Sequence, residues 1–375
     1  MKEIDNQSLA EQLILGWPLN KEIDGTPLPY PRIVPSYKKE RYDYQTHVKI
    51  LRTLLEALPT PDGDYAALVS GGIDSSIVAC YTKPTKLYTA RWPGYDETHY
   101  AKIVAKHLGL ELEIIEIRET EETDRIIKEL LKANKYPRLG GEYPYYEIGR
   151  RISEDGYEAV VTGDSGDELF MRYGYTRNRF YQLAFAVRHN RKVKQAIHNL
   201  IASREKRLYT QIYHENPVTP EYRKRVYQTF LKKLNSYPTR NYPDQIMTYL
   251  LETGIQNQSN MLKRVLAIHS VEHFTPLYTP IMIEHVSRIP AKICLAPNKK
   301  LFKDAAKPKI PKEIYQRKGK TGFGMLPRKW IIENMDRIRR EIEERKIPAL
   351  DTSVKYTTNF NVIYYLGQLL EWIPK

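Results

Sequence analysis

The stretch Ser70-Gly71-Gly72-Ile73-Asp74-Ser75-Ser76 decides the fold of this 375-residue chain. It follows an apolar run, 65–69, that is typical of a buried strand, and it precedes residues 77–81, which begin a helical pattern. In such a loop the glycines let backbone N–H groups approach an anion, and the helix dipole favours negative charge. The serine hydroxyls add donors, and Asp74 can hold a Mg²⁺ ion. The stretch therefore predicts a phosphate-binding loop.

The spacing within this loop narrows the class of phosphate site. It lacks the Gly-Lys-Ser/Thr ending of a Walker A motif and the Gly-x-Gly-x-x-Gly spacing of a dinucleotide fold. It resembles instead the PP-loop, Ser-Gly-Gly-x-Asp-Ser, of ATP pyrophosphatases, which cleave ATP to AMP and pyrophosphate. An ordinary tight turn between a strand and a helix is the alternative, and the full seven residues in this context favour the phosphate loop.

The composition indicates a soluble globular protein, with 41% hydrophobic and 28% charged residues. No apolar run reaches the roughly 18–20 residues of a membrane span, and the acidic, polar start of the chain shows no secretory signal. Cys80 and Cys294 lie far apart in apolar contexts without metal-ligand spacing, so we expect two buried thiols. These features predict a cytoplasmic protein with no membrane partner.

The net charge of +14 raises the question of a nucleic-acid partner. Lysine and arginine are spread along the chain but are dense in 292–320. ATP and pyrophosphate also require cations, so this density has two explanations. Nucleic-acid binding therefore stays open as the alternative.

Hydrophobic periodicity predicts an α/β fold, namely a parallel sheet forming a PP-loop core, followed by a helical C-terminal region. Strands are predicted at 65–69, 86–90, 112–117 and 159–162, and helices at 47–58, 75–82, 98–108, 121–133, 145–154, 181–193, 221–234, 243–252, 261–272, 281–289, 329–345 and 362–372. The predicted parts are an extended, proline-rich lead-in (1–45), the ATP-binding core (46–175) and the mainly helical region (176–375). Ligands should lie at the carboxyl ends of the strands.

A second cluster of polar residues follows the strand predicted at 159–162. The segment 162–168 reads Thr-Gly-Asp-Ser-Gly-Asp-Glu, with carboxylates at Asp164, Asp167 and Glu168. An isolated acidic turn is usually a solvated cap. Here a buried strand aims it at the same sheet edge as the phosphate loop, where clustered carboxylates suit a Mg²⁺ ion beside a triphosphate.

Together these segments resemble the synthetase domain of the asparagine synthetase family, which couples the Ser-Gly-Gly-x-Asp-Ser-Ser loop to a later SGEGADELFGGY segment. The resemblance continues in the segments 95–97 and 108–110, 261–264, 272–277, 310–314 and 317–324, and in Trp330, over roughly residues 45–335 in the family's order. It implies an ATP-dependent, carbon–nitrogen bond-forming ligase.

The resemblance also implies roles for individual residues. Nucleotide and pyrophosphate binding is implied for Val69, Ser70, Gly71, Gly72, Asp74, Ser75, Ser76 and Gly163. Asp74 and Asp167 would hold Mg²⁺, with Glu168 nearby, and Asp164 would lie near the reacting carboxyl group. Lys320 would neutralise charge on the phosphates, and Lys318 competes for that role because one residue is inserted here.

Departures from the family in three segments, namely the start of the chain, residue 263 and residues 274–279, bear on the substrates. The chain begins Met1-Lys2 rather than Met-Cys, so we expect no glutamine hydrolysis by this chain. Lys263 stands where the family has aspartate, and Tyr278-Thr279 replaces leucine-aspartate. Phe274 replaces an arginine, so aspartate should bind poorly unless Lys263, Arg264 or His273 takes over; packing of Phe274 in the core is the alternative.

The expected reaction is activation of a carboxylate as an acyl-adenylate, followed by attack of ammonia or an amine. The nitrogen would come from free ammonia or from a separate glutaminase subunit. One rival is a PP-loop enzyme that adenylates a nucleic-acid base, and another is a non-catalytic relic that only binds a nucleotide or a partner. Retention of Asp74, Asp167 and Lys320 argues against the relic.

Overall fold

The computed structural model describes residues 4–26, 35–170, 217–239, 241–294, 297–319, 324–351, 354 and 357–373. The strands are β1 (Ala66–Leu68), β2 (Lys86–Arg91), β3 (Leu112–Glu116), β4 (Ala159–Val161) and β5 (Glu272–Phe274). The helices are α1 (Asn6–Leu15), α2 (Tyr44–Glu56), α3 (Ile73–Thr82), α4 (Thr98–Leu108), α5 (Thr123–Asn134), α6 (Tyr143–Glu154), α7 (Gly166–Leu169), α11 (Pro220–Asn235), α12 (Tyr242–Tyr249), α13 (Ile255–Ala267), α14 (Pro280–Arg288), α15 (Ala291–Cys294), α16 (Lys300–Ala306), α17 (Lys312–Gln316), α18 (Arg328–Arg345) and α19 (Phe360–Trp372). A π-helical stretch (Leu250–Gly254) joins α12 to α13, and a 3₁₀ turn (Pro297–Lys299) precedes α16.

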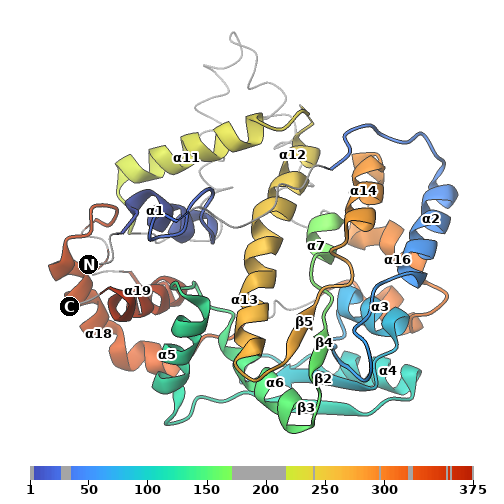
Figure 1. Ribbon diagram of the computed structural model, residues 1–375, viewed down its shortest axis with the longest axis horizontal. Helices are drawn as coiled ribbons and strands as arrows, with labels where there is room; N and C mark the ends of the chain where they lie inside the picture. Colours follow the sequence, from blue (N-terminus) through green and yellow to red (C-terminus); the bar gives the residue numbers. More distant parts are fainter. Residues whose placement is uncertain are drawn as a thin grey trace.

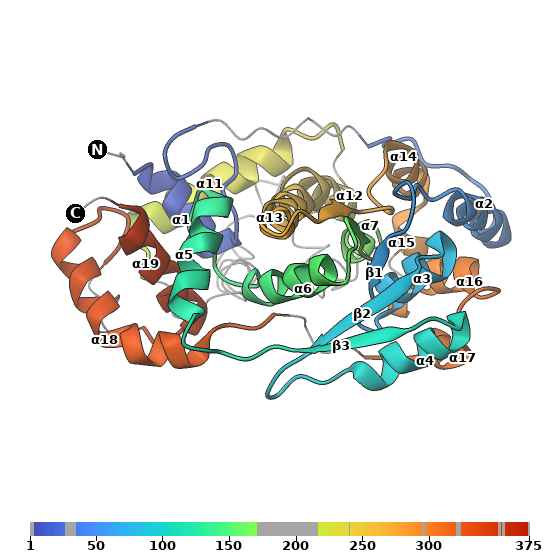
Figure 2. The ribbon, with the colours of Figure 1, turned by 60° about the horizontal axis from the view of Figure 1, so that its bottom comes forward.

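The five strands form one parallel sheet in the order β3-β2-β1-β4-β5 (Figures 1 and 2). This arrangement confirms the α/β fold class predicted from the sequence. The chain moves outward from β1 to β2 and β3 on one side, and to β4 and β5 on the other. A crevice therefore opens between the carboxyl ends of β1 and β4, which is where ligands bind in open parallel sheets.

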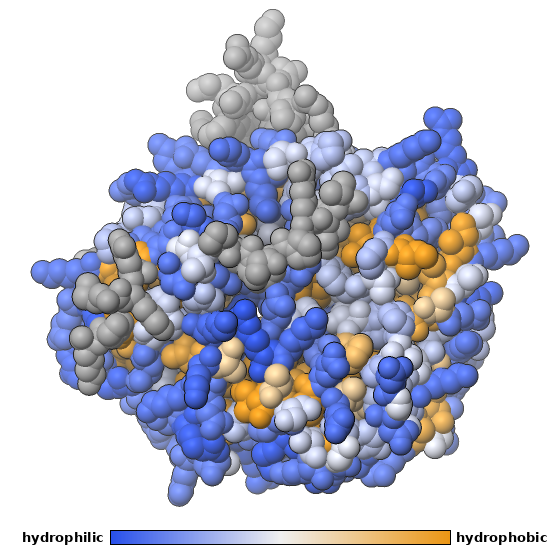
Figure 3. Space-filling model, viewed as in Figure 1, coloured by the Kyte–Doolittle hydropathy of each residue, from blue (hydrophilic) through white to orange (hydrophobic). Residues whose placement is uncertain are grey.

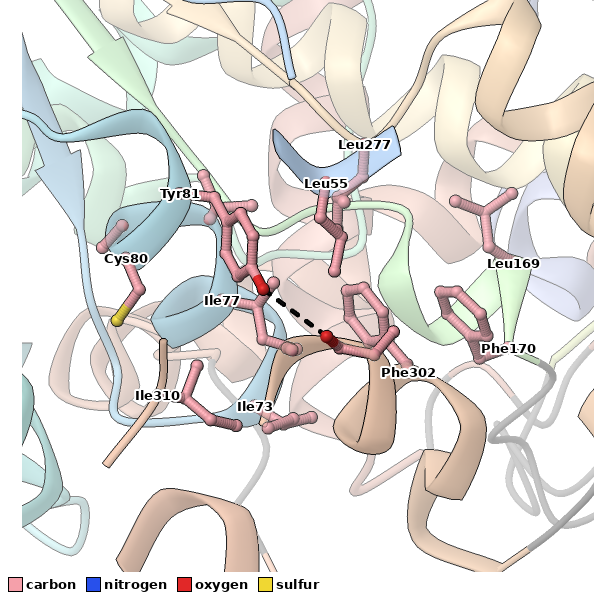
Figure 4. Close-up of a cluster of buried hydrophobic side chains, with 14 of the residues drawn as sticks. Leu55, Ile73, Ile77, Cys80, Tyr81, Leu169, Phe170, Leu277, Phe302 and Ile310 are labelled. Atoms are coloured by element: carbon pink, nitrogen blue, oxygen red, sulfur yellow. Dashed lines mark hydrogen bonds between the residues drawn. The ribbon is translucent and has the colours of Figure 1, made fainter. Parts of the chain in front are cut away.

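Alternating strand residues bury both faces of the sheet. Ala67 and Val161 point to one face, where they pack with α2, α3, α4 and α16. Ala66 and Val160 point to the opposite face, which is covered by α5, α6 and α13. Figure 4 shows part of the first cluster, in which Phe170 stacks on Phe302 with ring centroids 4.3 Å apart. This stacking ties α16 to the segment that follows β4.

A third hydrophobic cluster lies away from the sheet and joins α1, α11, α18 and α19 (Figures 1 and 2). Residues 1–45 were expected to be extended, yet Asn6–Leu15 form α1. Asp5 caps the helix, accepting from the backbone N–H groups of Gln7 and Ser8. Leu9 and Leu13, one turn apart, are fully buried in the cluster, so tertiary packing stabilises a helix that the proline-rich context obscured.

Two further expectations are corrected by the structure. The helix predicted at 261–272 ends at Ala267, and Glu272–Phe274 form the edge strand β5. A three-residue strand is too short to show a period of two, and its pairing with β4 decides its conformation. The helices predicted at 243–252 and 261–272 correspond to α12 and α13, and the π-helical stretch Leu250–Gly254 joins them without a break. The helix predicted at 181–193 lies outside the described residues.

The surface seen in Figure 3 is mostly hydrophilic, with hydrophobic residues showing in separate patches. Within the described part of the chain, no helix has the length and apolar character needed to cross a membrane. Cys80 and Cys294 are free and buried, as predicted, and burial raises the pKa of each thiol to about 12.

Candidate active site

The phosphate loop connects β1 to α3. Gly72 is the N-cap of α3 and makes no side-chain capping hydrogen bond, while its own N–H donates to the hydroxyl of Ser70. The hydroxyls of Ser70 and Ser75 lie 3.2 Å apart, and Ser75 also donates to the carbonyl of Gly72. These bonds hold the loop around the end of the helix, an arrangement that suits a phosphate group.

Gly71 brings the loop against α4. Its φ is +68°, and a Cβ at this position would lie 2.1 Å from Cβ of Tyr100 and 2.7 Å from its carbonyl carbon. Only glycine satisfies both the conformation and the close approach. Behind the loop, the guanidinium of Arg317 forms a buried ion pair with Glu97 and lies over the ring of Tyr100, 3.9 Å from its centroid. Two sequence segments 220 residues apart are thereby joined beside the loop.

The loop after β4 lies directly against the phosphate loop. A Cβ on Gly163 would come within 2.3 Å of the backbone nitrogen of Ser75 and 2.6 Å of the carbonyl carbon of Asp74. Because Gly163 has no side chain, the backbone after β4 can lie directly against the backbone of the phosphate loop after β1. As a result, the carboxylates of Asp74 and Asp167 face a common point.

That common point holds the ammonium group of Lys299. Its Nζ lies 2.5 Å from Oδ1 of Asp74 and 2.7 Å from Oδ1 of Asp167, and the side chain is only 1% exposed. Asn298 and Lys299 both have left-handed backbone conformations, with φ of +56° and +52°. Consecutive left-handed residues other than glycine are costly and are found where function requires them. Here they direct Lys299 between the two carboxylates.

The two carboxylates also fit a Mg²⁺ ion. They already place two oxygen atoms around one positive charge, and Mg²⁺ is commonly bound by one or two carboxylates together with phosphate oxygens and water. Among the described residues no group of three or more His, Cys, Asp or Glu side chains could hold a metal alone. The donor set therefore suits a metal that arrives with a nucleotide rather than one held by protein ligands only.

Two side chains anchor Asp164, Thr162 directly after β4 and His273 on β5. Thr162 Oγ1 donates to its Oδ2 at 2.5 Å, and His273 Nε2 lies 2.9 Å from the same hydroxyl and 3.5 Å from that carboxylate oxygen. Because the single hydroxyl proton goes to Asp164, His273 must carry a proton on Nε2 and donate it to Thr162. His273 is fully buried on β5, so this chain of bonds is shielded from solvent.

Two cavities meet at this edge of the sheet. One, of about 140 Å³, lies over the carboxyl ends of β1, β2 and β4, and the other, of about 560 Å³, extends toward α1, α13 and α19. They share a wall made of Asp74, Tyr145, Gly163 and Asp164. Burial and the charge of Asp164 raise the pKa of Tyr145 well above its ordinary value, so its hydroxyl stays protonated.

Most residues expected at the site lie around these cavities. The smaller cavity is lined by Val69, Ser70, Gly72, Asp74, Ser75, Gly163 and Asp164, and the larger one by Asp74, Gly163, Asp164, Asp167 and Glu168. Gly71 faces Tyr100, and the buried hydroxyl of Ser76 lines neither cavity. Lys318 lines a small recess beside Gly72 together with Lys303 and Arg317, whereas Lys320 lies outside the described residues.

Three residues of the site were not singled out from the sequence. Lys299 was one of many cations in the dense segment 292–320. What distinguishes it is the left-handed backbone conformation that it shares with Asn298, which is visible only in the structure. Thr162 belonged to the quoted segment but carried no assigned role. His273 was considered only as a substitute cation for substrate binding, and its contact with Thr162 depends on the unpredicted strand β5.

Comparison with known proteins agrees with this geometry. The model of the asparagine synthase family matches residues 52–355, which is more than half of the chain. The chain belongs to the asparagine synthase family. The resemblance inferred from the motifs is therefore confirmed, and the described residues before the match include α1 and the start of α2.

Curated relatives match over shorter stretches. A putative glutamine-hydrolysing asparagine synthetase 1 of Methanocaldococcus jannaschii is 31% identical over 121 residues, covering 31% of this chain and 22% of the relative. Asparagine synthetase B of Escherichia coli, also described as glutamine-hydrolysing, is 30% identical over 137 residues, covering 30% of this chain and 24% of the relative. The aligned part thus spans about a quarter of either relative.

Proposed function

We propose that this protein is an ATP-dependent amide-forming ligase that activates a carboxylate as an acyl-adenylate. One oxygen of the acid would attack the α-phosphorus of ATP, the bond from that phosphorus to the bridging oxygen would break, and pyrophosphate would leave. The nitrogen of ammonia or an amine would then attack the acyl carbon and displace AMP. Adenylation would replace oxide, a poor leaving group on the acyl carbon, with AMP, a good one.

One observation carries the proposal: the two cavities share the wall formed by Asp74, Tyr145, Gly163 and Asp164. The smaller cavity follows the phosphate loop and suits the nucleotide, and the larger one has room for the acid. The α-phosphorus and the carboxylate would meet at the shared wall, held in a reactive arrangement by two fixed loops.

The chain's own residues supply most of the charge stabilisation in this scheme. The N-terminus of α3 and the hydroxyls of Ser70 and Ser75 would bind the phosphates, and Lys299 would supply a buried positive charge beside them. Lys320 is proposed to act on the same phosphates. Asp74 and Asp167 would hold Mg²⁺, which would offset the negative charge of the leaving pyrophosphate.

Asp164 is proposed to accept the proton that the amine loses as the amide forms. Its carboxylate lines the larger cavity and is held in place by Thr162 and His273. A base fixed before the amine arrives needs no reorganisation during the reaction. Glu168, on the same cavity wall, is a second carboxylate near the acid.

Free ammonia, an amine or a separate glutaminase subunit is proposed as the nitrogen source. Neither described cysteine suits glutamine hydrolysis, because both are buried and burial raises their pKa. We expect the purified chain to use ammonium and to form no glutamate from glutamine. Release of glutamate from glutamine by the purified chain would contradict this part of the proposal.

Exchange of labelled pyrophosphate into ATP tests the central step. A panel of carboxylic acids is added one at a time with Mg²⁺, and amide formation is then followed with and without ammonium. Stimulation of exchange by at least one acid supports adenylation. Cleavage of ATP to ADP, or no exchange with any acid, would contradict it.

The net charge of +14 supports one alternative, adenylation of a base in a nucleic acid. This alternative predicts exchange that depends on added RNA or DNA and binding that weakens steeply with salt. The ligase proposal predicts neither. Exchange measured with acids and with transfer RNA, each at 50 and 200 mM salt, separates the two.

A further inference from the structure

A cavity separate from the active site lies between α5 and the end of α19 (Figures 1 and 2). This remote cavity has a volume of about 530 Å³, which is within the usual range for small-molecule sites. Among the residues that the structure describes, none lines both the remote cavity and one of the two active-site cavities. The proposed function therefore leaves the remote cavity without a role.

Three buried side chains give the remote cavity an apolar floor. Leu131 on α5, Tyr136 just after α5 and Trp372 at the end of α19 are each at most 9% exposed. Nε1 of Trp372 donates to the carbonyl of Lys135 at 2.8 Å, and the hydroxyl of Tyr136 donates to Oδ2 of Asp24 at 3.1 Å. These bonds join three segments of the chain, so the shape of the cavity is fixed before a ligand arrives.

Charged side chains of opposite sign line the same cavity. Lys132 and Lys135 come from the end of α5, and Glu371 comes from the last turn of α19. In the described part of the chain, none of these three side chains forms an ion pair or a side-chain hydrogen bond, either with one another or with a fourth residue. The remote cavity therefore presents unpaired charges of both signs.

The helix dipole accounts for only one of the two signs. The C-terminal end of a helix carries partial negative charge, which favours lysine there and disfavours glutamate. Lys132 and Lys135 thus suit the end of α5, whereas Glu371 gains nothing from its place at the end of α19. A cation supplied by a ligand would compensate Glu371.

The two other charged residues of the cavity are engaged within the protein. Lys128 forms an ion pair with Asp124 at 2.8 Å, and Glu371 attracts the same ammonium group only from a longer distance. Asp24 accepts hydrogen bonds from the backbone N–H and the hydroxyl of Thr26 in its own turn. The lysines at the end of α5 and the glutamate of α19 are therefore the groups that a ligand would meet.

We propose that the remote cavity binds a zwitterion with an apolar group, namely a free amino acid or a short peptide with an apolar side chain. Its carboxylate would pair with Lys132 and Lys135, its ammonium group with Glu371, and its side chain would lie on the apolar floor. A simple anion would leave Glu371 unpaired beside a like charge, and a simple cation would do the same to the lysines. This site does not depend on the proposed function.

Matched probes test the site by equilibrium dialysis with the full chain in the absence of ATP. Phenylalanine carries both charges, 3-phenylpropanoate lacks the ammonium group, and phenethylamine lacks the carboxylate. We expect the Kd of phenylalanine to be lower than that of either analogue by about 10-fold or more, because each analogue leaves one sign of charge unpaired. Glycylphenylalanine, whose charges lie farther apart, is measured alongside: tighter binding of this dipeptide than of phenylalanine assigns the site to peptides, and weaker binding assigns it to free amino acids.

Substitutions on the two sides of the cavity should affect different probe ratios. In Glu371→Gln the advantage of phenylalanine over 3-phenylpropanoate should fall to about twofold or less, because the ammonium group has lost its partner. In the double variant Lys132→Gln/Lys135→Gln the advantage over phenethylamine should fall in the same way. Matched controls are Glu344→Gln, at an exposed position in the last turn of α18, and Lys102→Gln/Lys106→Gln, at exposed positions on α4; neither should change the ratios.

The comparison of probes on the unmodified chain stands even if a variant fails to fold. Equal Kd values for the three probes, or no binding of phenylalanine and of the dipeptide, would overturn the site. Ratios that remain unchanged in both folded cavity variants would place the binding elsewhere, including at the active site, and would overturn it as well.

Discussion

The phosphate end and the outer wall of this site are built differently. The phosphate end comes from two short stretches, 69–76 and 162–168, that follow adjacent strands and touch through their backbones. The outer wall gathers Trp17, Arg138, Asn257 and Asn361 from segments spread over most of the chain. Its helices α1 and α19 pack in a hydrophobic cluster separate from the sheet. The first region can keep its contacts while the second changes, and under the proposed function this would separate ATP activation from the choice of acid.

The largest effect should follow from removing the paired carboxylates of the phosphate end. Asp74→Ala and Asp167→Ala should each lower pyrophosphate exchange by 10²-fold or more with every acid, because each removes half of the charge arrangement around Lys299. Asp155→Ala is the control, since this carboxylate pairs with Lys86 at the opposite edge of the sheet. Near-normal exchange in both folded variants would refute their assignment as metal ligands.

Gly163 offers a test of the backbone contact that joins the two stretches. In Gly163→Ala the new methyl group would meet the backbone of Asp74 and Ser75, which has no flexible side chain to move aside. We expect a loss of about 1–3 kcal/mol in the free energy of unfolding and a lower kcat for exchange. Gly324→Ala, where a Cβ meets no atom within 4 Å, should change neither quantity. Equal behaviour of the two variants would show that the contact is not required.

The sequence predicted the phosphate end better than the outer wall for a physical reason. Ser70 to Ser76 form a local motif whose loop and helix follow from glycine placement and one preceding strand. Arg138 and Asn257 meet only through tertiary packing, 119 residues apart, and neither belongs to a periodic or charged pattern. Similarly, α1 has Asp5 at its N-cap and Gly16 at its C-cap, but the prolines that follow it led to the prediction of an extended segment over residues 1–45. Short-range signals specify elements, whereas a cavity wall depends on which elements meet.

His273 contacts Thr162 and Asp164 in the second stretch of the phosphate end, and it tests whether acid activation and amide formation are separate steps. His273→Val removes the donor to Thr162 and loosens Asp164, while leaving the phosphate loop untouched. We expect amide formation to fall by about 10–100-fold, with pyrophosphate exchange within about threefold of normal. Thr162→Val interrupts the same chain of bonds and should give the same pattern. Equal loss of both activities would assign His273 a purely structural role.

The smallest effect concerns a region remote from both parts of the site, the contact between α2 and α14. The rings of His47 and His285 lie 6.2 Å apart there, and burial lowers the pKa of both below the ordinary value of 6.5. Asp43 and Glu40 near His47 oppose this shift, and Arg288 beside His285 adds to it. Both nitrogens of His47 lack a hydrogen-bond partner within the described residues, so no hydrogen bond there offsets the cost of burying a protonated ring.

The sign of the resulting pH dependence follows from these lowered pKa values. About one pH unit or more above 6.5 both histidines are neutral in the folded and unfolded chains, and their contribution to stability is complete. As the pH falls below 6.5, the unfolded chain binds protons first, so stability is lost by up to about 1.4 kcal/mol per pH unit for each histidine until its folded pKa is passed. Urea unfolding between pH 7.5 and 5.5 should show a smaller slope for His47→Phe than for the unmodified chain. Tyr42→Ala, which removes a ring beside His47 but no histidine, should keep the original slope, and an unchanged slope in His47→Phe would refute the assignment.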